Sequence, residues 1–193
     1  MNFSERLIQN LHDSIAAKQD FLQEAEQISN FHNAVAMLIS AYHEGGRVYI
    51  AGNGGSAADA QHIAAEFVSR LARERGPLPA MAMTVDSSVL TAIGNDYGYE
   101  EVFARQVAGL MRQEDVFLGI TTSGNSANII RALEQCRQMG LKSIVFTGKD
   151  GGKVKALADY CIIASGCETA TIQELHIVLG HSLCGCVEAE LFQ

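Results

Sequence analysis

The stretch that decides the fold is Gly52-Asn53-Gly54-Gly55-Ser56, which separates two patterned segments. Before it lies the apolar run Val48-Tyr49-Ile50-Ala51, and after it a helix-forming segment begins at Ala57. A strand therefore ends in a glycine-rich turn that opens a helix, and Ser56 is expected to cap that helix. Glycines let a backbone approach an anion closely, and the free N–H groups of a first helical turn point at it. We interpret the turn as a phosphate cradle.

Two other glycine-rich motifs compete for this turn. The dinucleotide fingerprint G-x-G-x-x-G is met at Gly52 and Gly54 but fails at Ala57. The nucleotide triphosphatase loop requires a Gly-Lys-Ser/Thr ending, and no lysine stands in this stretch. A turn with only a structural role is the remaining alternative.

A second strand-to-helix junction repeats the pattern. The buried-strand run over residues 116–120 is followed by Thr121-Thr122-Ser123-Gly124-Asn125-Ser126, and then by helical spacing over Ala127–Met139. Loops that follow two parallel strands meet at the carboxyl edge of an open sheet, where ligands bind in this architecture. One phosphorylated small molecule can therefore span both loops.

The rest of the chain predicts an α/β fold. Helical spacing without proline over Phe3–His43 predicts two helices, or one long bent helix, ended by Gly45-Gly46. Further along we expect strands at Arg47–Ala51, Ala80–Val85, Val116–Thr121, Ser143–Thr147 and Tyr160–Ala164, and helices at Ala57–Arg70, Ser87–Ile93, Glu100–Met111, Ala127–Met139, Val154–Ala158 and Thr169–Leu191. This alternation gives a mainly parallel sheet with helices on both faces.

The composition suits one domain. A chain of 193 residues that is 48% hydrophobic buries a sizeable core, as a helical arm at 1–45 followed by an α/β core at 46–193. The arm packs either on another subunit or on its own domain.

The five cysteines lack metal-binding spacing, and neither a leader nor an apolar span of about 20 residues is present, so we expect a soluble cytoplasmic protein with no membrane partner. A net charge of −8 argues against a nucleic-acid surface.

His62 and Glu66 stand four apart on the helix that opens at the first loop, so they share one face. This pairs a base with a metal-ligating side chain; the alternative is a surface pair worth a few tenths of a kcal/mol. Arg70, four residues further, either meets a carboxylate or the ligand's phosphate, or is solvated.

The last predicted helix carries polar side chains in an apolar stretch, and such groups need partners because an unsatisfied buried one costs about 1–3 kcal/mol. Gln173 and His181, eight apart, differ by about 80° in rotation and about 12 Å in rise, so spacing alone does not join them. Glu174 is better aligned with His181 and offers a rival pairing. His176 is expected to be a satisfied core or interface residue.

With these residues in hand, the chain resembles the bacterial phosphoheptose isomerases, the sedoheptulose 7-phosphate isomerases of the sugar isomerase (SIS) domain family. The resemblance runs nearly end to end and rests on GNGGSAADAQHIAAE at 52–66, LTAIGNDYG at 90–98, TTSGNS at 121–126, TGKDGG at 147–152 and IQELHIVLGH at 172–181. It implies a five-stranded parallel sheet flanked by helices, in a homotetramer with active sites built between subunits.

The resemblance also implies roles for individual residues. Glu66 matches the catalytic carboxylate and His181 the catalytic histidine, while the zinc ligands of metal-containing members match His62, Glu66, Gln173 and His181. The substrate-binding positions match Asn53, Gly54, Gly55, Ser56, Glu66, Arg70, Asn95, Asp96, Thr121, Thr122, Ser123, Ser126 and Gln173. The sequence departs from its relatives at Ala170 and Thr171, where they often have an acidic and a basic residue.

The implied reaction converts sedoheptulose 7-phosphate to glycero-manno-heptose 7-phosphate, the first step of nucleotide-activated heptose synthesis for lipopolysaccharide or a related glycoconjugate. Glu66 would move the proton between adjacent carbons, and His181 or zinc would serve the oxygens. Three alternatives are a non-catalytic tetramer that binds the replication-initiator protein, a sugar-phosphate sensor, and an isomerase of another ketose phosphate. Neither of the first two needs the set His62, Glu66, Gln173 and His181.

Overall fold

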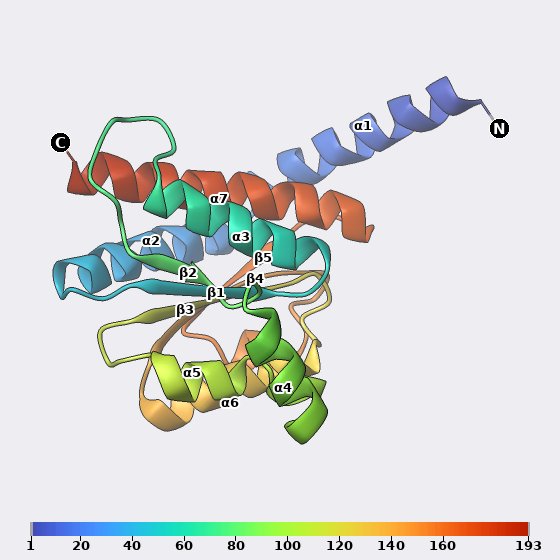
Figure 1. The fold of residues 1–193 in the computed structure, drawn as a ribbon. Helices are drawn as coiled ribbons and strands as arrows, with labels where there is room; N and C mark the ends of the chain where they lie inside the picture. Colours follow the sequence, from blue (N-terminus) through green and yellow to red (C-terminus); the bar gives the residue numbers. More distant parts are fainter. Residues whose placement is uncertain (1, 193) are drawn as a thin grey trace.

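The centre of the fold is a five-stranded sheet whose strands all run parallel, in the order β2-β1-β3-β4-β5 (Figure 1). We describe it from a computed structural model, which covers residues 2–192. The strands are β1 (Val48–Gly52), β2 (Ala80–Ala82), β3 (Val116–Thr121), β4 (Lys142–Gly148) and β5 (Tyr160–Ala164). The predicted α/β class is confirmed.

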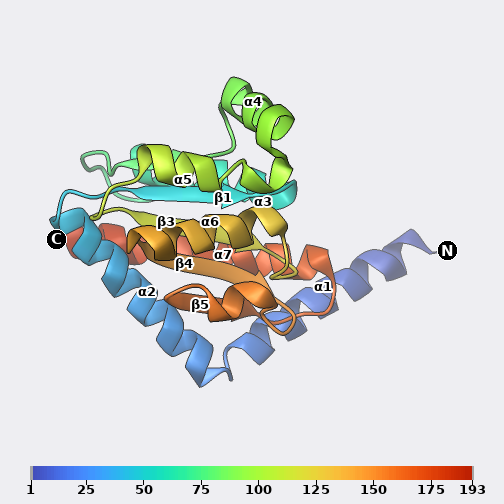
Figure 2. The same cartoon turned by 90° about the horizontal axis from the view of Figure 1, so that it is seen from below.

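Helices cover both faces of the sheet, as Figures 1 and 2 show. One face carries α2 (Ala25–His43), α3 (Gly55–Val68) and α7 (Thr169–Leu191), with α1 (Phe3–Phe21) leading into this layer. The other face carries α4 (Ser87–Tyr97), η1 (Tyr99–Glu101), α5 (Ala104–Leu110), α6 (Ala127–Met139) and η2 (Lys153–Ala156).

The buried strands explain this layering. Every residue of β1 and of β3 is buried, so each strand needs an apolar partner on both faces. Along β1, Val48 and Ile50 join the core beneath α3 and α7, whereas Tyr49 and Ala51 join the core beneath α5 and α6. The alternation of side chains along a strand thus builds two cores on one sheet.

The N-terminal segment forms two separate helices, α1 and α2, and not one long bent helix, so the first of the two predicted alternatives is confirmed. In both views α1 extends beyond the body of the molecule (Figures 1 and 2). Its apolar positions remain exposed in this chain: Phe3 is 84% exposed, Leu7 60% and Leu11 55%. The stripe that predicted an amphipathic helix therefore finds no complete partner within the described residues.

Four local predictions were wrong. The helix predicted at Glu100–Met111 is instead the short 3₁₀ helix η1 followed by α5, which is α-helical only over Ala104–Leu110. Ser56 does not cap α3, because the N-cap is Gly54, whose φ of +55° suits glycine, and Ser56 lies buried in the first turn. The segment 94–98 does not interrupt a helix; α4 continues through Gly94 to Tyr97, and the chain turns at Gly98, where φ is +96°. Strand β2 ends at Ala82, three residues before its predicted end.

Candidate active site

The two Ser/Gly loops lie next to each other at the carboxyl edge of the sheet. Gly52 at the end of β1 is in register with Ile120 of β3, one residue before the second loop begins. The strand that follows β1 in the chain, β2, lies on one side of β1, and the next strand, β3, lies on its other side. The strand order reverses at β1, so this edge is the topological switch point of the sheet. The predicted juxtaposition of the loops is therefore present.

The first loop depends on close packing around its glycines. A Cβ on Gly52 would lie 2.5 Å from the Ser56 carbonyl oxygen, and one on Gly55 would lie 3.0 Å from Cδ of Gln173. The backbone of Ser56 therefore leaves no room for a side chain at Gly52, whereas a side chain at Gly55 would have to displace the Gln173 amide. The Gln173 side chain lies directly over Gly55, at the N-terminal end of α3.

The Asn53 side chain is held by its neighbours. It exchanges two hydrogen bonds with the amide of Asn128 on α6, donating at 2.9 Å and accepting at 2.8 Å, and its oxygen also accepts from the Tyr99 hydroxyl at 3.1 Å. Asn128 is buried, with 3% exposure. This reciprocal pair ties the first loop to the helix that follows the second loop.

The second loop is braced by the segment after β4. Gly124 has φ of +66°, and a Cβ there would lie 2.5 Å from the carbonyl carbon of Gly151. The Val154 N–H donates to the Gly124 carbonyl at 3.1 Å. The hydroxyls of Thr121 and Ser126, the first and last residues of the loop, lie 2.9 Å apart. The loop also contains the half-buried hydroxyl residues Thr122 and Ser123.

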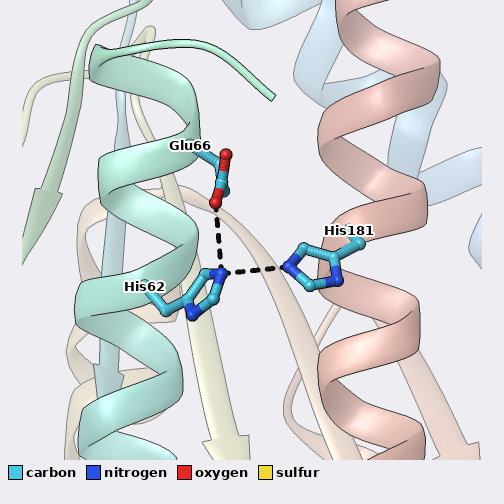
Figure 3. Close-up of side chains that lie close together, drawn as sticks. All are labelled: His62, Glu66 and His181. Carbon is cyan, nitrogen blue, oxygen red and sulfur yellow. Dashed lines mark hydrogen bonds and ion pairs between the residues drawn. The ribbon is translucent and has the colours of Figure 1, made fainter. Parts of the chain in front are cut away.

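A cluster of three side chains joins α3 to α7 (Figure 3). His62 Nε2 lies 3.1 Å from Glu66 Oε1 and 3.0 Å from His181 Nε2. The helices run in parallel and in close contact, because Gly180 of α7 faces Ile63 of α3: a Cβ on Gly180 would lie 2.6 Å from Ile63 Cδ1. The predicted i,i+4 pair is therefore real, and packing brings the predicted histidine to it.

The atoms of this cluster fit a metal ion better than they fit one another. His62 Nε2 carries at most one hydrogen, so Glu66 and His181 compete for the same proton. A cation at the centre would instead accept a lone pair from all three atoms, which lie within 4.8 Å of one another. Two imidazole nitrogens and one carboxylate oxygen are a donor set of catalytic zinc sites. The described residues thus include a cluster that can hold a metal ion.

The fourth predicted ligand, Gln173, does not join this cluster within one chain. It lies on Gly55, and eight residues of α7, about 12 Å of rise, separate it from His181. Arg70 lies beyond the end of α3 and forms an exposed ion pair with Glu74. Asn95 and Asp96 are exposed at the end of α4, where the Asn95 amide donates to Asp96 at 2.7 Å.

The rival pairing of Glu174 with His181 was wrong. Glu174 accepts a hydrogen bond from Ser14 and lies 3.4 Å from Lys18 Nζ, so it connects α7 to α1. His176 is fully buried, as predicted, and its Nε2 lies 2.9 Å from the Thr147 carbonyl oxygen. Its Nδ1 has no hydrogen-bond partner among the described residues, so the ring is satisfied at one nitrogen only. Burial lowers the pKa of His176 to about 4, so the ring is neutral and donates to that carbonyl.

Sequence reasoning missed the residues that support the site. Asn128 carried no signal beyond its place in a helix, and neither Arg75 nor Glu188 was singled out. Yet those two form an almost fully buried ion pair at 2.8 Å, where Arg75 is 1% and Glu188 3% exposed in their side chains. The available signal was a charged residue, Glu188, directly after the apolar run of the last helix. Thr171, which the sequence analysis singled out beside Ala170, is buried beside Gly166.

Two structural findings bear on the setting of the site. Among the helices of residues 2–192, none combines the length and the apolar character that crossing a membrane requires. The five cysteines are free thiols; Cys136, Cys161 and Cys184 are buried, while Cys167 and Cys186 are exposed.

The family model of the SIS domain matches residues 12–148, so this open parallel sheet with hydroxyl-rich loops at its switch point belongs to a SIS domain protein. Phosphoheptose isomerase 2 from Campylobacter jejuni is 52% identical over 180 residues, 93% of this chain and 90% of that protein. The phosphoheptose isomerase of Aneurinibacillus thermoaerophilus is 48% identical over 184 residues, 95% of this chain and 93% of its own.

A solved structure agrees with these relatives. Phosphoheptose isomerase from Neisseria gonorrhoeae superimposes with a TM-score of 0.91 at 40% identity, covering 97% of this chain and all of that one. The chain therefore belongs to the phosphoheptose isomerases.

Proposed function

We infer that this protein interconverts sedoheptulose 7-phosphate and glycero-manno-heptose 7-phosphate, with Glu66 as the base. The observation that carries the residue assignment is the convergence of His62, Glu66 and His181 at the contact between α3 and α7. A phosphate-binding sensor or a binding-only tetramer has no use for a carboxylate and two imidazoles at one point. The relatives named as isomerases favour the same conclusion.

The phosphate group is proposed to bind at the two loops. The first supplies the backbone of Asn53, Gly54 and Gly55 at the start of α3, with Ser56 in its first turn. The second supplies hydroxyls, from Thr121, Thr122, Ser123 and Ser126. Helix N-termini and hydroxyl groups suit a dianion without a lysine, which agrees with the acidic chain. The Asn53 side chain serves mainly to fix this loop, since Asn128 and Tyr99 occupy it.

The reaction moves one carbon-bound proton. The Glu66 carboxylate removes a proton from C1 of the ketose, leaving an enediolate across C1 and C2, and returns a proton to C2 to give the aldose. The hydroxyl proton must pass from O1 to O2 in the same turnover. We propose that either His181 carries it or zinc serves these two oxygens instead. Asn95 and Asp96 are proposed to bind the sugar hydroxyls, and Arg70 the phosphate once substrate draws it from Glu74.

A zinc ion is the proposed cofactor, held by His62, Glu66 and His181, with Gln173 as a fourth ligand. Zinc would supply Lewis acidity to the two oxygens that share the enediolate charge. Gln173 of the same chain lies at the far end of α3, so we propose that this ligand comes from another subunit. The carboxylate and both imidazoles come from α3 and α7 of one chain, which are in close contact where Gly180 faces Ile63.

We further propose that the chain works as a homotetramer. His62 is 49% exposed, and Glu66 lies eleven residues from Gly55, so the cluster and the phosphate loops of one chain are far apart and open. A partner subunit would bring a phosphate loop to the cluster and exclude water. The exposed apolar stripe of α1 offers the contact. The arm at residues 1–45 would thus serve assembly, and the core at 46–193 would serve catalysis within one domain.

The proposed place of the reaction is the cytoplasm, as the first step toward nucleotide-activated heptose for lipopolysaccharide. The test is direct. Purified protein is mixed with sedoheptulose 7-phosphate, and the aldoheptose phosphate is followed by NMR, after chelation and after zinc is restored. Turnover that is lost with chelator and regained with zinc supports the activity and the metal. A verified tetramer that converts nothing with zinc present would overturn the proposed activity.

Controls separate the activity from the metal. Turnover that persists unchanged in excess chelator would support the isomerase and reject the zinc. The Glu66→Gln variant should bind the substrate but lose turnover, because its amide cannot accept a proton. Glu134→Gln on α6 is the matched control, because it alters only a part-exposed ion pair with Arg131 on the opposite face of the sheet from the cluster.

A further inference from the structure

Arg75 and Glu188 form a buried ion pair that no step of the proposed reaction uses. Arg75 Nε lies 2.8 Å from Glu188 Oε2, and their side chains are 1% and 3% exposed. Burying such a pair costs more solvation than its attraction usually returns, and apolar replacements are often as stable. Stability alone therefore does not explain why this pair is buried, and the hydrogen bonds that its two side chains make indicate another role.

The Arg75 guanidinium caps the end of α3. Its Nη2 donates to the Glu66 carbonyl oxygen at 2.8 Å and its Nη1 to the Phe67 carbonyl oxygen at 2.9 Å. Helix α3 ends at Val68, so these carbonyls belong to the last turn, where intrahelical donors run out. Arginine alone among side chains has enough fixed N–H groups to bond both carbonyls and a carboxylate at once.

Glu188 fastens the same end of α3 to α7. Its carboxylate accepts from the backbone N–H groups of Leu71, Ala72 and Arg73 at 3.3, 3.2 and 2.8 Å. Glu188 lies seven residues after His181, two helical turns along the same face of α7. The helix that carries His181 thus holds the backbone that follows Glu66.

We propose that Arg75 and Glu188 are positioning residues that set Glu66 against His62 and His181. The pair fixes the last turn of α3, which would otherwise fray, at one distance from α7. This inference rests on the proposed role of Glu66, and neither residue touches the substrate. A shift of about 1 Å in a catalytic group costs up to about 100-fold in rate, so loosening this cap should act on turnover.

The test compares full-length Arg75→Lys and Glu188→Gln with the wild type. Lysine keeps the charge but cannot bridge the two carbonyls, and we expect kcat to fall about 10- to 100-fold with KM changed less than about 3-fold. The matched control is Arg73→Lys in the same loop, because the Arg73 side chain is exposed and bonds only the Phe192 carbonyl at 3.4 Å among the described residues. It should keep wild-type kcat.

A second readout distinguishes positioning from stability alone. In protein labelled with ¹³C-histidine, the His62 ring signals report its contact with Glu66, and Glu66→Gln defines the signal without that carboxylate. The Arg75→Lys signals should move toward those of Glu66→Gln. A merely structural pair would lower the melting temperature and leave kcat and these signals unchanged, which would overturn the proposal.

The two variants keep the proposal falsifiable. Glu188→Gln differs by one atom and gives the same comparison if Arg75→Lys does not fold. If the wild type itself fails to isomerise the sugar, the proposed function fails, while the histidine signals still decide whether the pair positions Glu66.

Discussion

Gly124 offers a quantitative test of the packing between the loops that follow β3 and β4. Alanine at this position must adopt φ of +66°, which costs about 1–2 kcal/mol for an L-residue. Its Cβ would also lie 2.5 Å from the Gly151 carbonyl carbon, with Gly152 N at 2.8 Å. Both are backbone atoms, so the loops after β3 and β4 must separate, and such overpacking costs about 1–3 kcal/mol. Gly124→Ala should therefore lose about 2–5 kcal/mol.

The assay is thermal unfolding at one fixed protein concentration, because assembly makes the midpoint depend on concentration. For a chain of this size each kcal/mol moves the midpoint by about 2–4 °C, so we expect a drop of about 4–20 °C. Gly109→Ala in α5 is the control: a Cβ there meets nothing within 4 Å, and the change should be neutral or stabilising by up to about 1 kcal/mol. A Gly124→Ala protein that melts within 2 °C of the wild type, on the scale of a change below about 1 kcal/mol, would refute the packing argument.

Three further predictions follow from burial and exposure. Burial lowers the pKa of His176 to about 4 from an unfolded value near 6.5, so the free energy of unfolding should fall by about 2–3 kcal/mol as the pH drops from 7.5 to 4.5. Urea titrations at the two pH values should show this loss in the wild type but not in His176→Gln. A thiol reagent should label Cys167 and Cys186 rapidly and the three buried cysteines only after unfolding, and burial raises the pKa of Cys136 to about 12; rapid labelling of all five in native protein would contradict the burial. Leu7→Lys with Leu11→Lys places charge on the exposed stripe of α1, so light scattering should show a smaller assembly than the wild type, and an unchanged mass would remove α1 from the interface.

Local pattern was sufficient where it was strongest. The bounds of β3, α6, β5 and α7 agree with their predicted residues, because long apolar runs and helical spacing end there at clear turn residues. Prediction failed at glycines. Gly94 was predicted to end a helix, but it lies inside α4. Asp86 caps the start of that helix by accepting from the Val89 N–H at 2.9 Å, and the chain turns only at Gly98.

The site shows the same division between local and tertiary information. The pair of His62 and Glu66 follows from helical spacing alone, and the structure places them in contact. The partner of His181 could not be deduced from its own helix, because it depends on the close contact of Gly180 with Ile63 of α3. The same limit hid Arg75 and Glu188, whose contacts join segments more than a hundred residues apart. The resemblance to the family supplied the roles that spacing could not assign.

The central claim is that Glu66 moves a carbon-bound proton, and the most direct measurement is isomerisation in D₂O followed by NMR of the product. An enediolate formed by Glu66 exchanges its proton with solvent, so deuterium should appear at C2 of the aldoheptose phosphate, and Glu66→Gln should form almost no product. Complete retention of the substrate's own hydrogen, with unimpaired turnover by Glu66→Gln, would contradict the account.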